Sequence, residues 1–116
     1  MKIVNLDQFL AMPSGTVFAK YKPASFEEVL IKDVCNLESR DFMYQSLIEM
    51  DSTGTEDEEN ILDDALRNGS SFDLDLDCPG RDGMFEEGQL FAVYERQDVE
   101  QLIARLGQAL EEGYKS

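Results

Sequence analysis

The segment from Asp75 to Glu86 has residue types and a spacing that could bind calcium. It matches an EF-hand loop at the first, third, sixth and twelfth places, which hold two aspartates, a glycine and a glutamate. The fifth place, however, is Pro79, which has no ligating side chain. The residues before Asp75 predict a strand, whereas an EF-hand loop follows a helix. We therefore expect no metal site here.

Carboxylate catalysis is the second chemistry to consider, because Asp73, Asp75 and Asp77 stand at every other position. Paired carboxylates can support glycoside hydrolysis or magnesium-dependent phosphoryl transfer. Alternation along a strand, however, predicts an exposed row and not the desolvated cleft in which carboxylate pKa values are tuned. The chain has no histidine, which excludes Ser-His-Asp and Cys-His arrangements and imidazole zinc sites. We expect a protein that is not an enzyme and that needs no cofactor.

The two cysteines, Cys35 and Cys78, are expected to be unpaired, buried thiols. Two cysteines are too few for a disulfide framework, and free thiols are typical of a reducing cytosol. Cys78 follows three aspartates, which raise the pKa of a thiol and do not activate it as a nucleophile.

Length and composition predict one soluble domain covering residues 1–116. Hydrophobic residues make up 42% of the chain, which is enough for a core, and no apolar run is long enough to span a membrane. The 25 Asp and Glu outnumber the 10 Lys and Arg and give a net charge of −15. Direct binding to nucleic acid is disfavoured, because phosphate contacts need clustered Lys and Arg.

In the first half of the chain, Asn5 and Gln8 form a capping pair that predicts a short helix. Residues 16–21 are rich in β-branched and aromatic side chains and predict a strand. A turn and a returning strand at 29–34 would complete a hairpin. The segment 41–48 is compatible with either a strand or a helix.

Two amphipathic helices are expected in the second half. Capping boxes at Thr55-x-x-Glu58 and Asp98-x-x-Gln101 would begin them, and each helix ends near a glycine. Each carries apolar residues at helical spacing. The two stripes are Ile61, Leu62, Ala65 and Leu66, and Val99, Leu102, Ile103, Leu106 and Leu110.

Residues 72–77 alternate as FDLDLD, which predicts a half-buried strand with its aspartates facing solvent. The segment 78–89 contains three glycines and a proline and predicts a loop, with 80–83 as a turn, before a strand at 90–95. Strand pairs separated by helices indicate an α+β fold, a single antiparallel sheet packed against two or three helices.

The negative charge is concentrated in one third of the chain. Residues 51–88 hold 13 acidic and two basic residues, a net charge of −11. The aspartates of the FDLDLD strand would form a row about 13 Å long, whereas acids in the first turn of a helix are also explained by the macrodipole. We expect partner-binding residues in the helix start, the strand and the following loop: Glu56, Asp57, Glu58, Glu59, Asp73, Asp75, Asp77, Asp82, Met84, Phe85, Glu86 and Glu87.

Three stretches resemble small acidic proteins of tailed phages and prophages: TVFAKYKP (16–23), DFMYQSLI (41–48) and GRDGMFEEGQLFAVYERQDVEQLIARL (80–106). The resemblance implies a bacterial cytoplasmic setting and assigns no role to any residue. Small acidic phage proteins often block host machinery that holds nucleic acid, including restriction and CRISPR complexes, so an inhibitor is expected by analogy.

These observations favour a non-enzymatic, DNA-mimic-like protein whose acidic face occupies a basic, nucleic-acid-binding surface of a host protein or complex. The alternative is a structural or assembly protein that binds through apolar contacts and uses its acids only for solubility. A homodimer is compatible with either function. Met84 and Phe85 would be apolar anchors among the acids if exposed, or would fold back onto the core.

Overall fold

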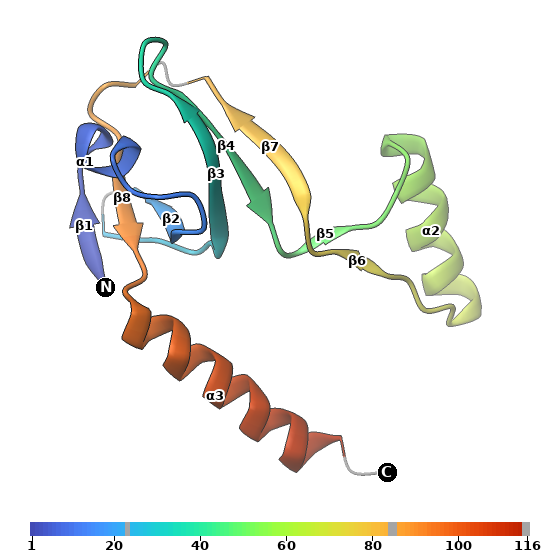
Figure 1. The fold of residues 1–116 in the computed structure, drawn as a ribbon. Helices are drawn as coiled ribbons and strands as arrows, with labels where there is room; N and C mark the ends of the chain where they lie inside the picture. Colours follow the sequence, from blue (N-terminus) through green and yellow to red (C-terminus); the bar gives the residue numbers. More distant parts are fainter. Residues whose placement is uncertain (23, 84–85, 115–116) are drawn as a thin grey trace.

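The computed structural model describes residues 1–22, 24–83 and 86–114, and it confirms the predicted single α+β domain (Figure 1). The elements in chain order are β1 (Lys2–Val4), α1 (Leu6–Leu10), β2 (Val17–Tyr21), β3 (Leu30–Asn36), β4 (Asp41–Ser46), β5 (Glu49–Met50), α2 (Thr55–Asn68), β6 (Leu74–Asp75), β7 (Cys78–Asp82), β8 (Leu90–Val93) and α3 (Arg96–Gly113).

Six strands form one antiparallel sheet in the order β1-β8-β2-β3-β4-β7. The predicted hairpin is confirmed as β2 and β3, and the ambiguous segment 41–48 contains strand β4. The short β5 and β6 pair with each other and extend the β4–β7 ribbon beyond the sheet, up to α2 (Figure 1).

The core lies between α1 and one face of the sheet. Asn5 and Gln8 form the predicted capping box, which begins α1 and directs Phe9 onto the strands. Phe9 stacks on Phe91 with 4.2 Å between ring centroids, and Phe18 and Phe42 meet it at steeper angles. All four rings are fully buried, so this aromatic cluster is the centre of the domain.

A buried lysine closes the end of α1. Lys32 is 2% exposed, and its ammonium donates to the backbone carbonyls of Leu10 and Met12. A bulge in β3 places two residues between Lys32 and Cys35 where β4 has one between Tyr44 and Phe42, so the side chains of Lys32 and Cys35 both lie on the core face. The ammonium thus satisfies carbonyls that the short helix leaves without intrahelical partners.

The segment after α2 differs from both predictions made for it. The FDLDLD stretch contributes only Leu74–Asp75 to a strand, and its apolar residues Phe72, Leu74 and Leu76 are exposed. The half-buried strand was wrong because the ribbon has left the core at this point, so alternation has no buried face to follow.

The predicted loop at 78–89 was also wrong in its first part, and 80–83 is not a turn. Cys78–Asp82 forms β7, paired along its whole length with β4. Gly80 is needed there because the Tyr44 ring lies over it: a Cβ at Gly80 would come within 2.5 Å of the ring. Gly80 therefore allows the Tyr44 ring to pack closely against the backbone of β7.

The two longer helices form as predicted, but their caps differ. Thr55 lies inside α2, whose N-cap is Gly54, and Gly69 ends the helix in the left-handed conformation. Asp98 is the third helical residue of α3, whose capping box is formed with Glu95. Of the helices in residues 1–22, 24–83 and 86–114, only α1 covers the sheet, whereas the bodies of α2 and α3 extend from it (Figure 1).

These two extensions give the molecule an open shape. The radius of gyration is 17.0 Å, compared with about 13 Å for a compact domain of similar length. Neither α2 nor α3 has a fully buried residue, and the leucines of both apolar stripes, with Ile103, are exposed.

The aromatic cluster yields a stability prediction. Phe9→Ala should lower the free energy of unfolding by about 3–5 kcal/mol, because it removes the ring that contacts the other three. Phe26→Ala is the matched control, since Phe26 is 43% exposed, and it should cost less than about 1 kcal/mol. Urea unfolding measures both values, and equal losses would contradict this position of the core.

Candidate acidic interface

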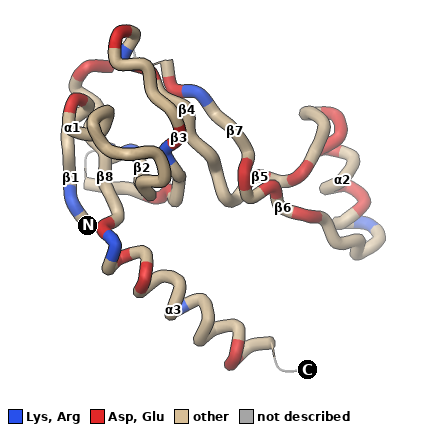
Figure 2. Tube along the Cα trace, viewed as in Figure 1, with Lys and Arg blue, Asp and Glu red and all other residues tan. Residues whose placement is uncertain are grey.

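Residues 47–77 form a projection that we call the acidic arm. It comprises β5, α2 and β6, and it contains 11 Asp and Glu but a single Arg, a net charge of −10. Figure 2 shows the acidic positions along α2 and along the ribbon that leads to it. Two thirds of the net charge of the protein therefore belong to a segment outside the core.

The predicted acids at the start of α2 divide into two pairs. Asp57 accepts from the backbone amide of Thr53 at 2.9 Å, and Glu58 accepts from the hydroxyl of Ser52 at 3.2 Å. These two are half-buried and stabilise the helix start, where the macrodipole also favours them. Glu56 and Glu59 are exposed, so they contribute to the outer surface.

The predicted row of three aspartates is not a regular strand edge. Asp73 and Asp77 are exposed, whereas Asp75 is half-buried and accepts from the backbone amide of Asp77 at 2.9 Å. This bond belongs to the turn at residues 76–77, between β6 and β7, where strand alternation ends. The straight 13 Å row was wrong, although all three residues lie at the base of the acidic arm.

Carboxylates from three elements of the arm lie near Cys78. The pKa of its thiol is raised, first by burial and then by the negative charges of Asp75, Glu49 and Glu58. These residues belong to β6, β5 and α2, so charges distant in the sequence gather within reach of one sulfur. Both cysteines are unpaired, as expected, but they are half-buried where buried thiols were predicted, and the raised pKa does not activate Cys78 as a nucleophile.

Asp82 does not belong to the acidic surface, in contrast to the prediction. It lies at the end of β7 away from the arm, about 13 Å from Cys78 along the strand. Its side chain is 15% exposed, lies on the core face and forms an ion pair with Lys20 of β2. The ion pair neutralises the carboxylate, so it cannot serve a partner in this position.

The remaining loop acids are also separated from the arm. Glu86 and Glu87 are exposed in the connection from β7 to β8, at the opposite end of β7 from α2 (Figure 1). Met84 and Phe85, predicted as apolar anchors, lie outside the described residues. The predicted interface thus divides into an acidic arm and a separate loop.

The calcium-like segment has a structure unlike an EF-hand loop. Asp75 pairs with Glu49 across the ribbon, and Gly80 pairs with Tyr44 in the sheet. An extended, paired backbone cannot wrap around an ion as a calcium loop does. Among the described residues, no group of three or more Asp, Glu, Cys or His side chains could hold a metal ion.

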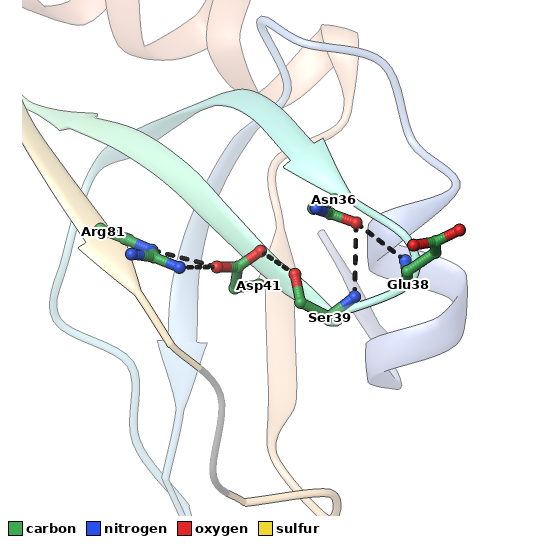
Figure 3. Close-up of polar contacts among 5 residues, drawn as sticks. All are labelled: Asn36, Glu38, Ser39, Asp41 and Arg81. Carbon is green, nitrogen blue, oxygen red and sulfur yellow. Dashed lines mark hydrogen bonds and ion pairs between the residues drawn. The ribbon is translucent and has the colours of Figure 1, made fainter.

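A second charged cluster lies at the turn from β3 to β4, beside a pocket of about 240 Å³ (Figure 3). Asp41 accepts from the Ser39 hydroxyl at 2.6 Å with one oxygen and from the Arg81 guanidinium with the other. Asn36 accepts from the backbone amides of Glu38 and Ser39. Because both oxygens of Asp41 are engaged within the chain, this cluster joins β7 to the turn.

The arm also presents exposed apolar residues that were not part of the predicted site. Leu66 is 85% exposed, and Ile48, Leu62 and Phe72 are exposed as well. Glu49 and Asp51 of the arm were absent from the predicted site, because Glu49 precedes the segment of highest charge and Asp51 stands at its start, before the helix. Their pairing with β6, through Asp75 and the Asp73 carbonyl, is a tertiary feature that no local pattern indicates.

Comparison with protein-family models, curated proteins and solved structures finds no match to this chain. In the part of the chain that the structure describes, no helix has the length and apolar character needed to cross a membrane.

The Asp41 cluster yields a prediction on acid stability. The Ser39 hydroxyl and then the Arg81 guanidinium hold the pKa of Asp41 below its usual value of 3.8. The stability that this lowered pKa contributes is present above about pH 4 and is lost as the pH falls through the pKa of the folded state. Asp41→Asn should therefore show a shallower decline of stability below about pH 4 than the wild type.

Urea unfolding at a series of pH values measures this difference. Asp51→Asn is the control, because Asp51 is exposed, and it should follow the wild-type decline. An Asp41→Asn profile parallel to the wild type across the acid range would show that the cluster makes no such contribution.

Proposed function

We propose that the protein is a non-enzymatic binding protein whose acidic arm occupies a basic, nucleic-acid-binding surface of a partner protein. The observation that carries the proposal is the concentration of a net charge of −10 in residues 47–77, a segment that projects from the sheet (Figure 2). A projecting element can enter a groove that the flat face of a sheet cannot reach.

The charge spacing of the arm supports imitation of a phosphate backbone. The 14 residues of α2 span about 21 Å and carry six carboxylates, of which four are exposed, or one exposed carboxylate per about 5 Å. Phosphates of one DNA strand are spaced by about 3.4 Å. A surface built to hold a nucleic-acid strand would thus meet a charge density of the same order, and long-range attraction would speed the encounter.

The exposed apolar residues of the arm would provide a contact that slows dissociation, which charge alone does not provide. Leu66 lies three residues after Asp63 and four after Leu62, so these side chains are neighbours on α2. An exposed leucine beside carboxylates has the arrangement of an interface anchor with a polar rim. The apolar contact would slow dissociation, whereas the acids would mainly increase the association rate.

The resemblance of three stretches to phage and prophage proteins supports a bacterial partner. A host defence complex or another nucleic-acid-processing complex has the basic groove that the arm would fill. Under this proposal the protein is an inhibitor that competes with nucleic acid, and it acts in the bacterial cytoplasm.

Reversing two exposed arm charges should weaken capture of the partner. Asp73→Lys with Asp77→Lys changes the net charge by +4 at positions that make no side-chain contact with the core. The measurement is capture from bacterial lysate on the immobilised protein, followed by elution with duplex DNA. The wild type should retain a protein that DNA displaces, and the variant should retain at least about tenfold less of it.

The matched control is Glu27→Lys with Glu38→Lys, which makes the same charge change at exposed positions outside the arm. The control should capture nearly as much as the wild type. Equal losses in both variants would indicate a net-charge effect, and a captured protein that DNA cannot displace would contradict competition for a nucleic-acid surface.

A second candidate function is assembly through apolar contacts, with the acids serving solubility. The exposed stripes of α2 and α3 favour it, since monomeric proteins rarely expose large contiguous apolar patches. Salt discriminates the two functions: a complex held by the arm should dissociate steeply as ionic strength rises, and an apolar complex should persist. Leu66→Ser should abolish only a complex that uses the α2 stripe.

A further inference from the structure

Exposed acids and exposed leucines form two neighbouring rows on α2. Glu56, Glu59 and Asp63 follow one another at intervals of three and four residues, which places them on one side of the helix. Leu62 and Leu66 form the second row, and they lie three residues after Glu59 and Asp63, respectively. All five side chains are exposed. The outer face of α2 therefore presents charge and apolar surface side by side.

Contacts at the start of α2 determine that these rows face outward. Asp57 and Glu58 accept hydrogen bonds from the residues just before the helix. Ile61 and Ala65 are half-buried and lie on the same side of the helix as these two acids. The acidic row and the leucine row lie on the opposite side, so a partner can contact both without displacing the helix from the arm.

The ribbon at the base of the arm repeats this combination. Phe72, Leu74 and Leu76 are exposed, and so are Asp73 and Asp77, which stand beside them in the sequence. Solubility explains exposed carboxylates but not large apolar side chains next to them. Both parts of the arm thus combine the two kinds of surface.

A nucleic-acid duplex and a single strand differ in the surface that they present to a protein. A duplex keeps the faces of its bases stacked inside, so a site that binds it is mainly polar and basic. A single strand exposes phosphates and base faces along the same length. The grooves that bind it combine basic residues along the backbone with aromatic side chains on which the bases stack. Only the second kind of groove complements both rows of α2.

We propose that the surface occupied by the acidic arm is a groove that binds single-stranded nucleic acid. The acids lie against the basic residues of the groove, in place of phosphates. Leu62 and Leu66 lie against its aromatic side chains, in place of bases, since burial of apolar surface is favourable whichever group provides it. This inference rests on the function proposed above and specifies the class of partner.

The outer face of α2 stays negative when its own ion pair is included. Arg67, the one basic residue of the helix, pairs with Asp63 at 2.7 Å. The four exposed acids, Glu56, Glu59, Asp63 and Asp64, leave a net charge of −3 beside this arginine. Because Arg67 lies in the last turn, the first two turns present acids alone, and their attraction to a basic groove is not offset.

Competition between single-stranded and duplex DNA tests the proposal. The protein retained from bacterial lysate on the immobilised full chain is eluted with oligothymidine of about 20 nucleotides or with a duplex of the same length. Oligothymidine should elute it at a concentration at least about tenfold lower than the duplex requires. The eluted protein, once purified, should bind labelled oligothymidine, and the full chain should displace the label.

The outcomes separate this inference from the function on which it rests. A duplex that elutes the protein as well as oligothymidine does, or better, would overturn the single-strand groove and leave competition with nucleic acid intact. Retention of no protein, or of a protein that neither competitor elutes, would overturn both.

Substitution of the leucine row tests the apolar contact at constant net charge. Leu62→Ser with Leu66→Ser should weaken binding of the purified partner at least about tenfold, because two apolar contacts are lost. Leu106→Ser with Leu110→Ser is the matched control, since it makes the same change at the same spacing on exposed positions of α3, and it should bind as the wild type does. Equal losses in both variants, or no loss in either, would overturn the role of the leucines in place of bases.

Discussion

Four phenylalanine rings between α1 and the sheet form the packed core, and they determine which elements belong to that core and which extend from it. Phe9 contacts the other three, which come from β2, β4 and β8, so strands far apart in the sequence share one apolar centre. Lys32 makes this arrangement compatible with a helix of only five residues, because its ammonium satisfies the carbonyls at the helix end. Elements that do not reach these rings are held by backbone ladders, caps and ion pairs such as Arg81 with Asp41.

The distribution of charge follows from this division between the packed sheet and the acidic arm. Within the sheet, carboxylates have specific partners: Asp41 with Ser39 and Arg81, and Asp82 with Lys20. The arm concentrates unbalanced charge where water screens it, so mutual repulsion costs the core little. The stability of the domain thus depends on the sheet and its core, and charges can accumulate in the arm without unfolding the sheet.

Local signals in the sequence were sufficient for elements whose pattern is complete in a few residues. The Asn5–Gln8 capping box and the β2–β3 hairpin are of this kind, and the α+β class follows from their order. Patterns that need a distant partner were misread. Alternation at 72–77 predicted a buried face, but the ribbon has left the core there, and Gly80 indicated a turn because its neighbour Tyr44 is 36 positions away. The concentration of charge in the acidic arm could be predicted from composition. The ion pair of Asp82 with Lys20 could not, because it depends on the register of β7 in the sheet.

The arm begins and ends at adjacent strands. β4 leads into it and β7 leads out, and these two strands are hydrogen-bonded neighbours at the edge of the sheet. A short turn could therefore join them directly, since the two ends are already close and little closure entropy is involved. Insertion into this segment, or its replacement by a short turn, would consequently leave the aromatic centre of the domain unchanged.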